Sequence, residues 1–259
     1  MESSRQEGAQ GRQFDPNKLA GVLFDMDGTL TLPHQIDFTK MKERLGIPPH
    51  EDVLRTLKER YGDSPDEYAR AMQIIDEVEA EGAAELALQP YCRELLAALR
   101  RSRPDVKTAL VTRNSRKQAA HFASMLECNG ASFDAIISRD ECETLSMPVK
   151  PSPAVCFHLA NQWGVSPEDC MFVGDFRDDM LCGKGAGAWT CLIENHKNQE
   201  FRELADLSVD SLAALARHLQ LPLAAPSSSV HVDMGEGIGG GGVAVDVCVS
   251  SGSMKAVAG

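Results

Sequence analysis

The sequence predicts an α/β protein with a doubly wound parallel sheet and a small helical domain inserted after the first strand. Three observations support this prediction. Short apolar segments typical of buried strands alternate with helical segments from Pro90 onward. The first such strand, residues 21–25, ends in Asp25, and a second aspartate, Asp27, follows it in the sequence. A charged stretch of helical periodicity, residues 37–89, then separates this strand from the rest of the sheet.

The first strand is predicted because a small residue and three apolar residues, 21–24, precede a turn, which fits a buried strand. Asp25 and Asp27 follow where the chain leaves the sheet, and open α/β folds bind their ligands at that edge. Asp27 and Gly28 are also a common turn pair, so the structural alternative is a strand that ends in an ordinary turn. The polar motifs further along the chain argue against this alternative.

Residues 37–86 are predicted to form the helical insertion. An amphipathic helix is expected over residues 67–81, because its apolar side chains recur at helical spacing. Asp63-Ser64-Pro65 supplies a start signal for this helix, and Pro48-Pro49 ends the helix before it.

The remaining elements alternate along the chain in the manner of a parallel sheet with helices on both faces. Right-handed crossovers between such strands bring their carboxyl ends to one edge of the sheet. Strands are predicted at residues 107–111, 135–138, 170–174 and 189–193, and helices at residues 91–101, 115–126, 153–163, 178–186 and 211–219.

The two ends of the chain are predicted to be disordered. Residues 1–17 are polar, and residues 223–259 are rich in Gly and Ser. No apolar stretch approaches the ~20 residues that span a bilayer, and the N-terminus lacks the apolar segment of a secretory signal. The expected location is the cytoplasm, and the alternative is the chloroplast or another organelle reached through a short transit segment.

Composition narrows the class of partner and the redox state. The net charge is −12, and an acidic chain without a basic run has no electrostatic footprint for nucleic acid or an anionic membrane. A small-molecule partner is therefore expected; the sequence leaves the oligomeric state open, and a monomer is favoured. The 8 cysteines form no C-x-x-C pair and match no zinc spacing. They are interpreted as small buried side chains in a reducing compartment rather than as disulfides.

Polar residues follow strands or precede helices at four places, which the sheet topology can bring to one edge. Each of them has an ordinary structural explanation when it is taken alone: a turn, a helix cap or an exposed lysine. The four places are Asp25 with Asp27, Thr112, Lys150, and the segment Gly174-Asp175-Phe176-Arg177-Asp178-Asp179.

The order and spelling of these motifs resemble the haloacid dehalogenase-like (HAD) hydrolase superfamily. Its four motifs are DxDGT[LV], a strand ending in Ser or Thr, a Lys often followed by Pro, and GDxxxD. They match residues 25–30, Thr112, Lys150-Pro151, and Gly174, Asp175 and Asp179.

The resemblance covers about residues 19–220 and implies a Rossmann-like HAD core made of residues 18–36 and 87–222. The insertion at residues 37–86 resembles the C1-type cap of the phosphoglycolate phosphatase and β-phosphoglucomutase branch. The overall layout is similar to plant-type HAD-like hydrolases with a short cap.

The resemblance implies a phosphatase that hydrolyses a small soluble phosphomonoester through an aspartyl-phosphate intermediate. A carboxylate and a phosphate repel by about 4 kcal/mol for each pair of unit charges at ~4 Å and an effective dielectric of 20, so cations are needed in the site. Asp25 is then the nucleophile, Asp27 the general acid and base, and Lys150 the catalytic cation. Phosphate binding falls to Thr112, Arg113, Asn114 and Lys150, and Mg²⁺ binding to Asp25, the backbone carbonyl of Asp27, Asp175 and, directly or through water, Asp179.

Three alternatives use related residues. A phosphotransferase or mutase of the β-phosphoglucomutase type would use the same side chains, and the sequence does not separate it from a phosphatase. A C–halogen hydrolase needs no second aspartate in the first motif, so Asp27 argues against it. A non-catalytic phospho-acceptor or interaction module, such as a receiver domain, carries its acceptor on a middle strand and has no cap.

Overall fold

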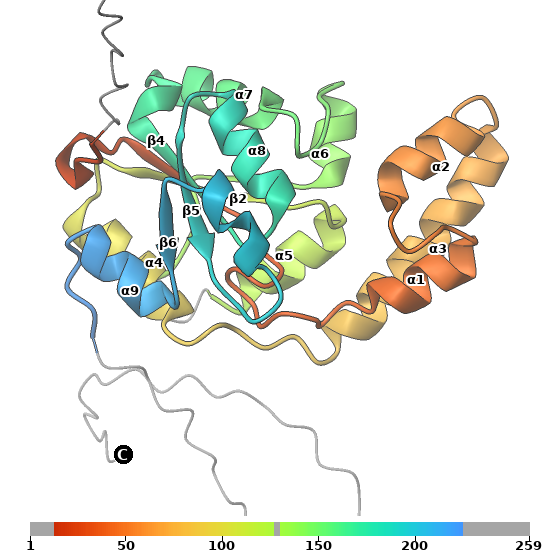
Figure 1. Ribbon diagram of the computed structural model, residues 1–259, viewed down its shortest axis with the longest axis horizontal. Helices are drawn as coiled ribbons and strands as arrows, with labels where there is room; N and C mark the ends of the chain where they lie inside the picture. The colour runs from red at the N-terminus through yellow and green to blue at the C-terminus, as the bar shows by residue number, and fades with distance from the viewer. Residues whose placement is uncertain (1–12, 127–129, 225–259) are drawn as a thin grey trace, which may run out of the picture.

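The computed structural model describes residues 13–126 and 130–224. Its centre is a parallel sheet of 6 strands in the order β3-β2-β1-β4-β5-β6, with helices on both faces (Figure 1). The strands are β1 (Gly21–Phe24), β2 (Lys107–Val111), β3 (Ala135–Ile137), β4 (Cys170–Gly174), β5 (Trp189–Ile193) and β6 (Leu207–Val209). The predicted fold class is confirmed.

The first strand lies in the middle of the sheet, between β2 and β4. Phe24 at its end is in register with Leu110 of β2 and with Val173 of β4. Because the strands are parallel, the chain leaves all three at the same edge. The loops after β1, β2 and β4 are therefore neighbours, although they are far apart in the sequence.

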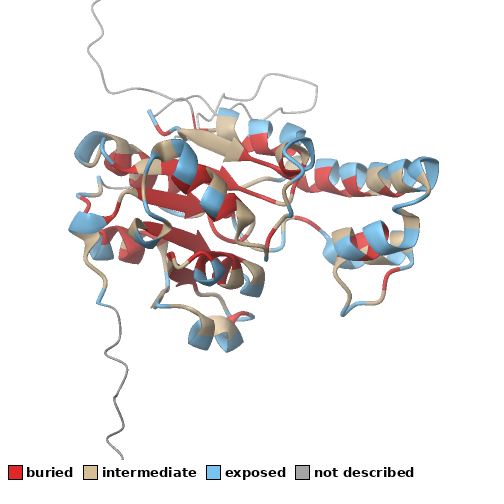
Figure 2. Ribbon diagram, turned by 90° about the horizontal axis from the view of Figure 1, so that it is seen from above, coloured by how far each residue is buried: buried red, intermediate tan, exposed pale blue. Residues whose placement is uncertain are grey.

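Helices cover both faces of the sheet, whose strands are largely buried (Figure 2). All four residues of β1 are buried for this reason. Val22 and Phe24 face a core that includes α4 (Cys92–Ser102), α5 (Arg116–Ser124) and α9 (Leu212–His218). Leu23 faces the opposite core, which includes α6 (Arg139–Thr144), α7 (Ala154–Trp163) and α8 (Arg177–Gly185). Successive residues of a strand point to opposite faces, so one short apolar segment serves both cores.

Three further helices stand beside the main body, within the predicted insertion (Figure 1). They are α1 (Phe38–Leu45), α2 (Val53–Tyr61) and α3 (Pro65–Ala83), and they share a small apolar core that includes Leu57 and Ile75. The chain enters and leaves this unit through two adjacent segments, since Thr31 forms an antiparallel bridge with Leu88.

The strand β6 and the helix α6 escaped prediction because their sequences are short and weakly patterned. β6 has 3 residues at the edge of the sheet. α6 has 6 residues, and its start depends on a reciprocal pair of hydrogen bonds between Ser138 and Glu141. Ser138 therefore caps this helix instead of extending the strand predicted at residues 135–138.

The prediction of disorder at the N-terminus extends too far along the chain. Asp15 caps a short 3₁₀ helix, η1 (Pro16–Lys18), and Phe14 packs edge-to-face on Trp189 with ring centroids 5.3 Å apart. An aromatic contact with the sheet holds this polar segment in place. Leu223 likewise packs against the core, while the rest of the predicted disorder, residues 1–12 and 225–259, lies outside the described residues.

The state of the cysteines and the presence of membrane-spanning helices can be checked in the part of the chain that the structure describes. Its 6 cysteines are free and buried, as expected, while Cys128 and Cys248 lie outside it. None of its helices is both long enough and apolar enough to cross a bilayer.

Candidate active site

Asp25 occupies the position directly after β1 and is almost fully buried. Its backbone N–H donates to the carbonyl of Val173 in β4, so the sheet holds its main chain. The chain then turns sharply, and the carbonyl of Met26 accepts hydrogen bonds from the N–H groups of Thr29, Leu30 and Thr31. This turn keeps the Asp25 side chain at the carboxyl edge of the sheet.

Lys150 brings the third motif to the first. Its side chain is only 4% exposed, and its ammonium group donates to Asp25 Oδ1, to Asp179 Oδ1 at 2.8 Å and to the carbonyl of Val111 at 3.1 Å. Burial opposes the charge of this group, but the carboxylates of Asp179 and Asp25 raise the pKa of Lys150 well above its ordinary value. The lysine is therefore a charged link between two buried acids.

Three carboxylates form a compact group at this edge. One oxygen each of Asp25, Asp175 and Asp179 lies within 4.8 Å of the others. Asp175 follows β4 beside Gly28, whose φ is +79° and at which a Cβ would lie 2.2 Å from Asp175 Oδ2. The close approach of the two loops thus requires a glycine in the first motif.

The electrostatics of this group favour a cation. Burial raises the pKa of Asp25 to about 6, against the opposing effect of Lys150. Burial, followed by the charges of Asp25 and Asp179, raises the pKa of Asp175 to about 8. Carboxylates that resist ionisation because they are buried together are stabilised by a bound cation, and oxygen donors of this kind suit a hard divalent ion.

Asp27 lies outside the group of three. Its Oδ2 accepts a hydrogen bond of 2.6 Å from Asn114 Nδ2, while its Oδ1 is buried and has no hydrogen-bond partner among the described residues. Burial and the charge of Asp25 raise the pKa of Asp27 to about 7. A carboxyl group with such a pKa can gain and lose a proton near neutral pH.

The loop after β2 carries three of the predicted phosphate-binding residues, Thr112, Arg113 and Asn114, and their side chains contact different partners. The Thr112 hydroxyl is buried and accepts a hydrogen bond of 3.1 Å from the Asn114 N–H. The Arg113 guanidinium is held instead by Asp178, at 3.0 Å, and by Asp52 of the helical insertion, at 2.5 Å. The structure therefore places Arg113 between the insertion and the core.

Two asparagines near the site were not singled out from the sequence. Asn195 donates to Asp175 Oδ2 at 3.3 Å, and Asn198 donates to the Asp175 carbonyl at 2.7 Å. Both lie in the loop that follows β5, and the position of this loop after a strand is the only signal that the sequence offers for them.

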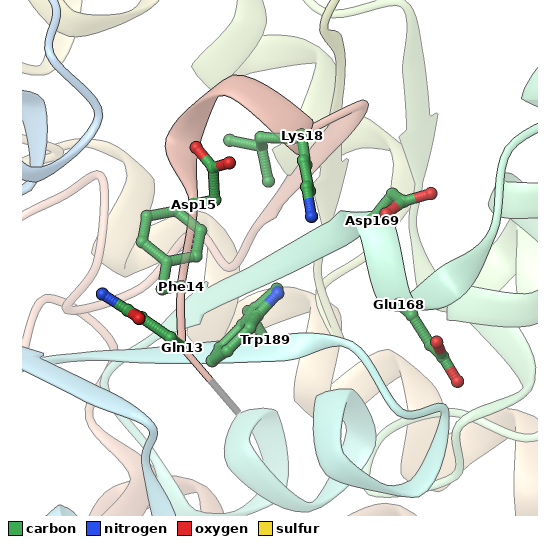
Figure 3. Close-up of a pocket in the computed structure, with 8 residues that line it drawn as sticks. Gln13, Phe14, Asp15, Lys18, Glu168, Asp169 and Trp189 are labelled. Atoms are coloured by element: carbon green, nitrogen blue, oxygen red, sulfur yellow. The ribbon is translucent and has the colours of Figure 1, made fainter. Parts of the chain in front are cut away.

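A cavity at the opposite edge of the sheet has a different lining. Phe14, Lys18, Asp169 and Trp189 are among its residues, which lie before or at the amino ends of β1, β4 and β5 (Figure 3). None of the predicted site residues lines this cavity, so the candidate site remains the carboxyl edge.

Known proteins are similar to this chain in sequence. The family model of haloacid dehalogenase-like hydrolases matches residues 19–187. A haloacid dehalogenase-like hydrolase domain-containing protein of Arabidopsis thaliana is 32% identical over 221 residues, which cover 78% of this chain and 84% of that protein. A phosphoglycolate phosphatase of Pseudomonas fluorescens is 31% identical over 242 residues, which cover 80% of this chain and 85% of that protein.

Solved structures agree with the sequence comparison. The crystal structure of a HAD phosphatase from Thermococcus onnurineus superposes with a TM-score of 0.54 at 25% identity, covering 78% of this chain and 98% of that one. The fold and the site define a hydrolase with a Rossmann-like parallel sheet and an aspartate at the end of its first strand. The chain belongs to the haloacid dehalogenase-like hydrolase family. The predicted family and the predicted class of enzyme are confirmed.

Proposed function

We propose that this protein is a phosphatase that hydrolyses a small phosphomonoester through an aspartyl-phosphate on Asp25. One observation carries the proposal. The ammonium group of Lys150 joins Asp25 to Asp179, and Asp25, Asp175 and Asp179 gather their oxygens within 4.8 Å. A nucleophilic carboxylate, a fixed cation and a cluster of oxygen ligands are the parts that phosphoryl transfer to an aspartate requires.

HAD phosphatases generally use a divalent metal ion, and the residues of this site fit one. Asp25 and Asp179 supply buried carboxylate oxygens and Asp175 a half-buried one, with raised pKa values for Asp25 and Asp175. The backbone carbonyl of Asp27 is a further candidate ligand. We assign Mg²⁺ to this place because it prefers such hard oxygen donors. When bound, the ion supplies positive charge that offsets the repulsion between the carboxylate and the phosphate.

The side chains of the protein account for both halves of the reaction. Lys150 holds Asp25 Oδ1, while Oδ2 accepts, within the described part of the chain, only a long hydrogen bond of 3.4 Å from the Thr29 hydroxyl. An Asp25 oxygen attacks phosphorus, the bond from phosphorus to the ester oxygen breaks, and Asp27 gives its proton to that oxygen. Water then attacks the phosphorus of the intermediate, Asp27 takes a proton from it, and inorganic phosphate and the Asp25 carboxylate are released.

The binding of the phosphate group depends in this proposal on the loop after β2. The Thr112 hydroxyl is its candidate donor, because the Ser115 and Arg116 N–H groups at the start of α5 already donate to the carboxylates of Glu79 and Asp140. Asn114 has a second role, since its amide holds Asp27 Oδ2 at 2.6 Å. We assign the residues 37–86 to a cap that closes over this site and keeps water away during the first half-reaction.

The direct test is a panel of phosphate esters assayed with the full chain. Phosphate release from small monoesters and from p-nitrophenyl phosphate is expected with Mg²⁺. It should stop in EDTA and return when Mg²⁺ is added in excess. Unchanged release in EDTA would contradict the metal assignment, and transfer of phosphate to a second hydroxyl without net release would indicate a phosphotransferase.

Replacing Gly28 with Ala is expected to lower phosphate release about tenfold or more, because the new Cβ would displace the Asp175 carboxylate. The positive φ of this position would also cost about 1–3 kcal/mol for a residue other than glycine. The Mg²⁺ concentration needed for half-maximal activity should rise as well. Gly46→Ala is the matched control, since Gly46 has φ +61° and nothing lies within 4 Å of an added Cβ. Equal effects of the two substitutions on Mg²⁺ dependence would refute the role given to Gly28.

A further inference from the structure

The cap contacts the core through acidic side chains. Within the described residues, 3 cap side chains form hydrogen bonds or ion pairs with the core, and each is a carboxylate. They are Asp52 at the start of α2, and Asp76 and Glu79 on α3. The face that the cap turns toward the catalytic loops is therefore negative.

Asp52 engages the loop that follows β2. Its Oδ2 pairs with Arg113 at 2.5 Å, while its Oδ1 accepts the Arg55 N–H at 2.9 Å and so caps α2. Arg113 pairs with Asp178 on its other branch, at 3.0 Å. Because one guanidinium serves two carboxylates, the group formed by Arg113, Asp52 and Asp178 has no net positive charge with which to attract an anionic substrate.

Glu79 engages the next part of the same loop and is more deeply buried. It is 3% exposed, accepts the Ser115 N–H at 3.2 Å and pairs with Arg139, which is 7% exposed. Arg139 also pairs with Asp76, so this guanidinium too serves two carboxylates. The negative charge of Glu79 contributes, after burial and Asp25, to the raised pKa of Asp27.

The two arginines beside the site are thus outnumbered by the carboxylates with which they pair. Lys150 is shared by Asp25 and Asp179 in the same way that the two arginines are shared. Arg177, the first residue of α8, and Lys197, in the loop after β5, are exposed, so solvent screens their charge. A divalent ion and Lys150 can balance a phosphate dianion, but little positive charge remains for a second anionic group.

We infer that the acidic cap selects phosphomonoesters whose leaving group is neutral or cationic, such as a polyol or an amino alcohol, and disfavours leaving groups with a carboxylate. This inference rests on the proposed phosphatase function and concerns only the part of the substrate that the cap covers. A carboxylate brought near Asp52, whose side chain is 31% exposed, would meet a like charge, whereas an ammonium group would be attracted there. The substrate would then differ from phosphoglycolate, the compound after which the Pseudomonas fluorescens relative is named.

Three esters that differ mainly in charge make the test direct: ethyl phosphate, phosphoethanolamine and phosphoglycolate, assayed with the full chain, Mg²⁺ and pH 7.5. All three phosphates are mainly dianions at this pH, so the comparison isolates the second group. The kcat/KM for phosphoglycolate is expected to be lower than that for ethyl phosphate by about tenfold, which corresponds to about 1.4 kcal/mol. The kcat/KM for phosphoethanolamine should equal or exceed that for ethyl phosphate.

Asp52→Asn locates the effect in the cap. Asparagine is as good a helix cap as aspartate, so α2 should be retained, while Arg113 loses one of its two carboxylate partners. The ratio of kcat/KM for phosphoglycolate to that for ethyl phosphate should rise by about threefold or more. Asp37→Asn is the control, because Asp37 also caps a cap helix, α1, by accepting the Lys40 N–H at 2.9 Å, but does not bond to the core.

The outcomes separate the two proposals. Turnover of ethyl phosphate with phosphoglycolate equal to it or preferred would overturn the selection by charge and leave the phosphatase function intact. The same change of ratio in Asp37→Asn and Asp52→Asn would overturn the role of the cap face. No turnover of any ester, p-nitrophenyl phosphate included, would refute the phosphatase function and this inference together.

Discussion

Replacing Asp25 with Asn is expected to lower phosphate release by about 10³-fold or more, since losses of this size follow the removal of a nucleophile. The amide has nearly the shape of the carboxylate but cannot attack phosphorus. The protein should stay folded, because Asp179 still pairs with Lys150 and the backbone of Asp25 still bonds to β4. Steady-state release of phosphate and the far-ultraviolet circular dichroism spectrum check the two parts of this expectation.

Two companion variants define what the Asp25 result means. Asp27→Asn should slow esters with poor leaving groups more than p-nitrophenyl phosphate, because an activated leaving group needs less help from a general acid. Asp37→Asn removes a carboxylate at an exposed helix cap and should leave phosphate release unchanged. An Asp25→Asn protein with more than a tenth of the wild-type kcat would exclude Asp25 as the nucleophile.

Replacing Lys150 with Met is expected to remove most activity and to destabilise the fold by about 3–5 kcal/mol, the range found when one partner of a buried ion pair is deleted. Methionine fills a similar volume, so the main change is the loss of the ammonium group between Asp25 and Asp179. Urea unfolding without metal measures this difference in the free energy of unfolding.

The pH dependence of the loss of stability in Lys150→Met gives an independent check. Without the ammonium group, the buried carboxyl groups should have pKa values in the folded protein that exceed those in the unfolded chain. Such groups stabilise the fold when protonated and lose that contribution as the pH rises through the folded pKa. The deficit of Lys150→Met should therefore be smaller at pH 5 than at pH 8.

Lys107→Met is the matched control for the stability measurement. Lys107 pairs with Asp134 at 3.4 Å, but its side chain is 44% exposed, and exposed pairs contribute about 0–1 kcal/mol. A deficit in Lys150→Met no larger than that of the control would contradict the structural role of the buried ammonium group.

The sequence by itself predicted five of the 6 strands of the sheet, the family, and the acids that lie at the carboxyl edge. Residues 21–24, 107–111 and 170–174 are short apolar runs whose character as buried strands depends on local composition. Parallel pairing then brings the ends of β1, β2 and β4 together whatever the remaining side chains do. For this reason the strand pattern alone assigns Asp25, Thr112 and Asp175 to one edge.

The tertiary structure alone decided where the side chains of the loops find partners. Arg113 looked like a phosphate ligand because it follows Thr112, yet its guanidinium lies between Asp52 and Asp178, which are 61 and 65 residues away along the chain. Asn195, Asn198 and Glu79 carry no motif and owe their place beside the site to the packing of a loop and of the cap. Secondary structure follows from nearby residues, whereas the pairing of charges depends on how distant segments pack, and no local pattern in the sequence records that distance.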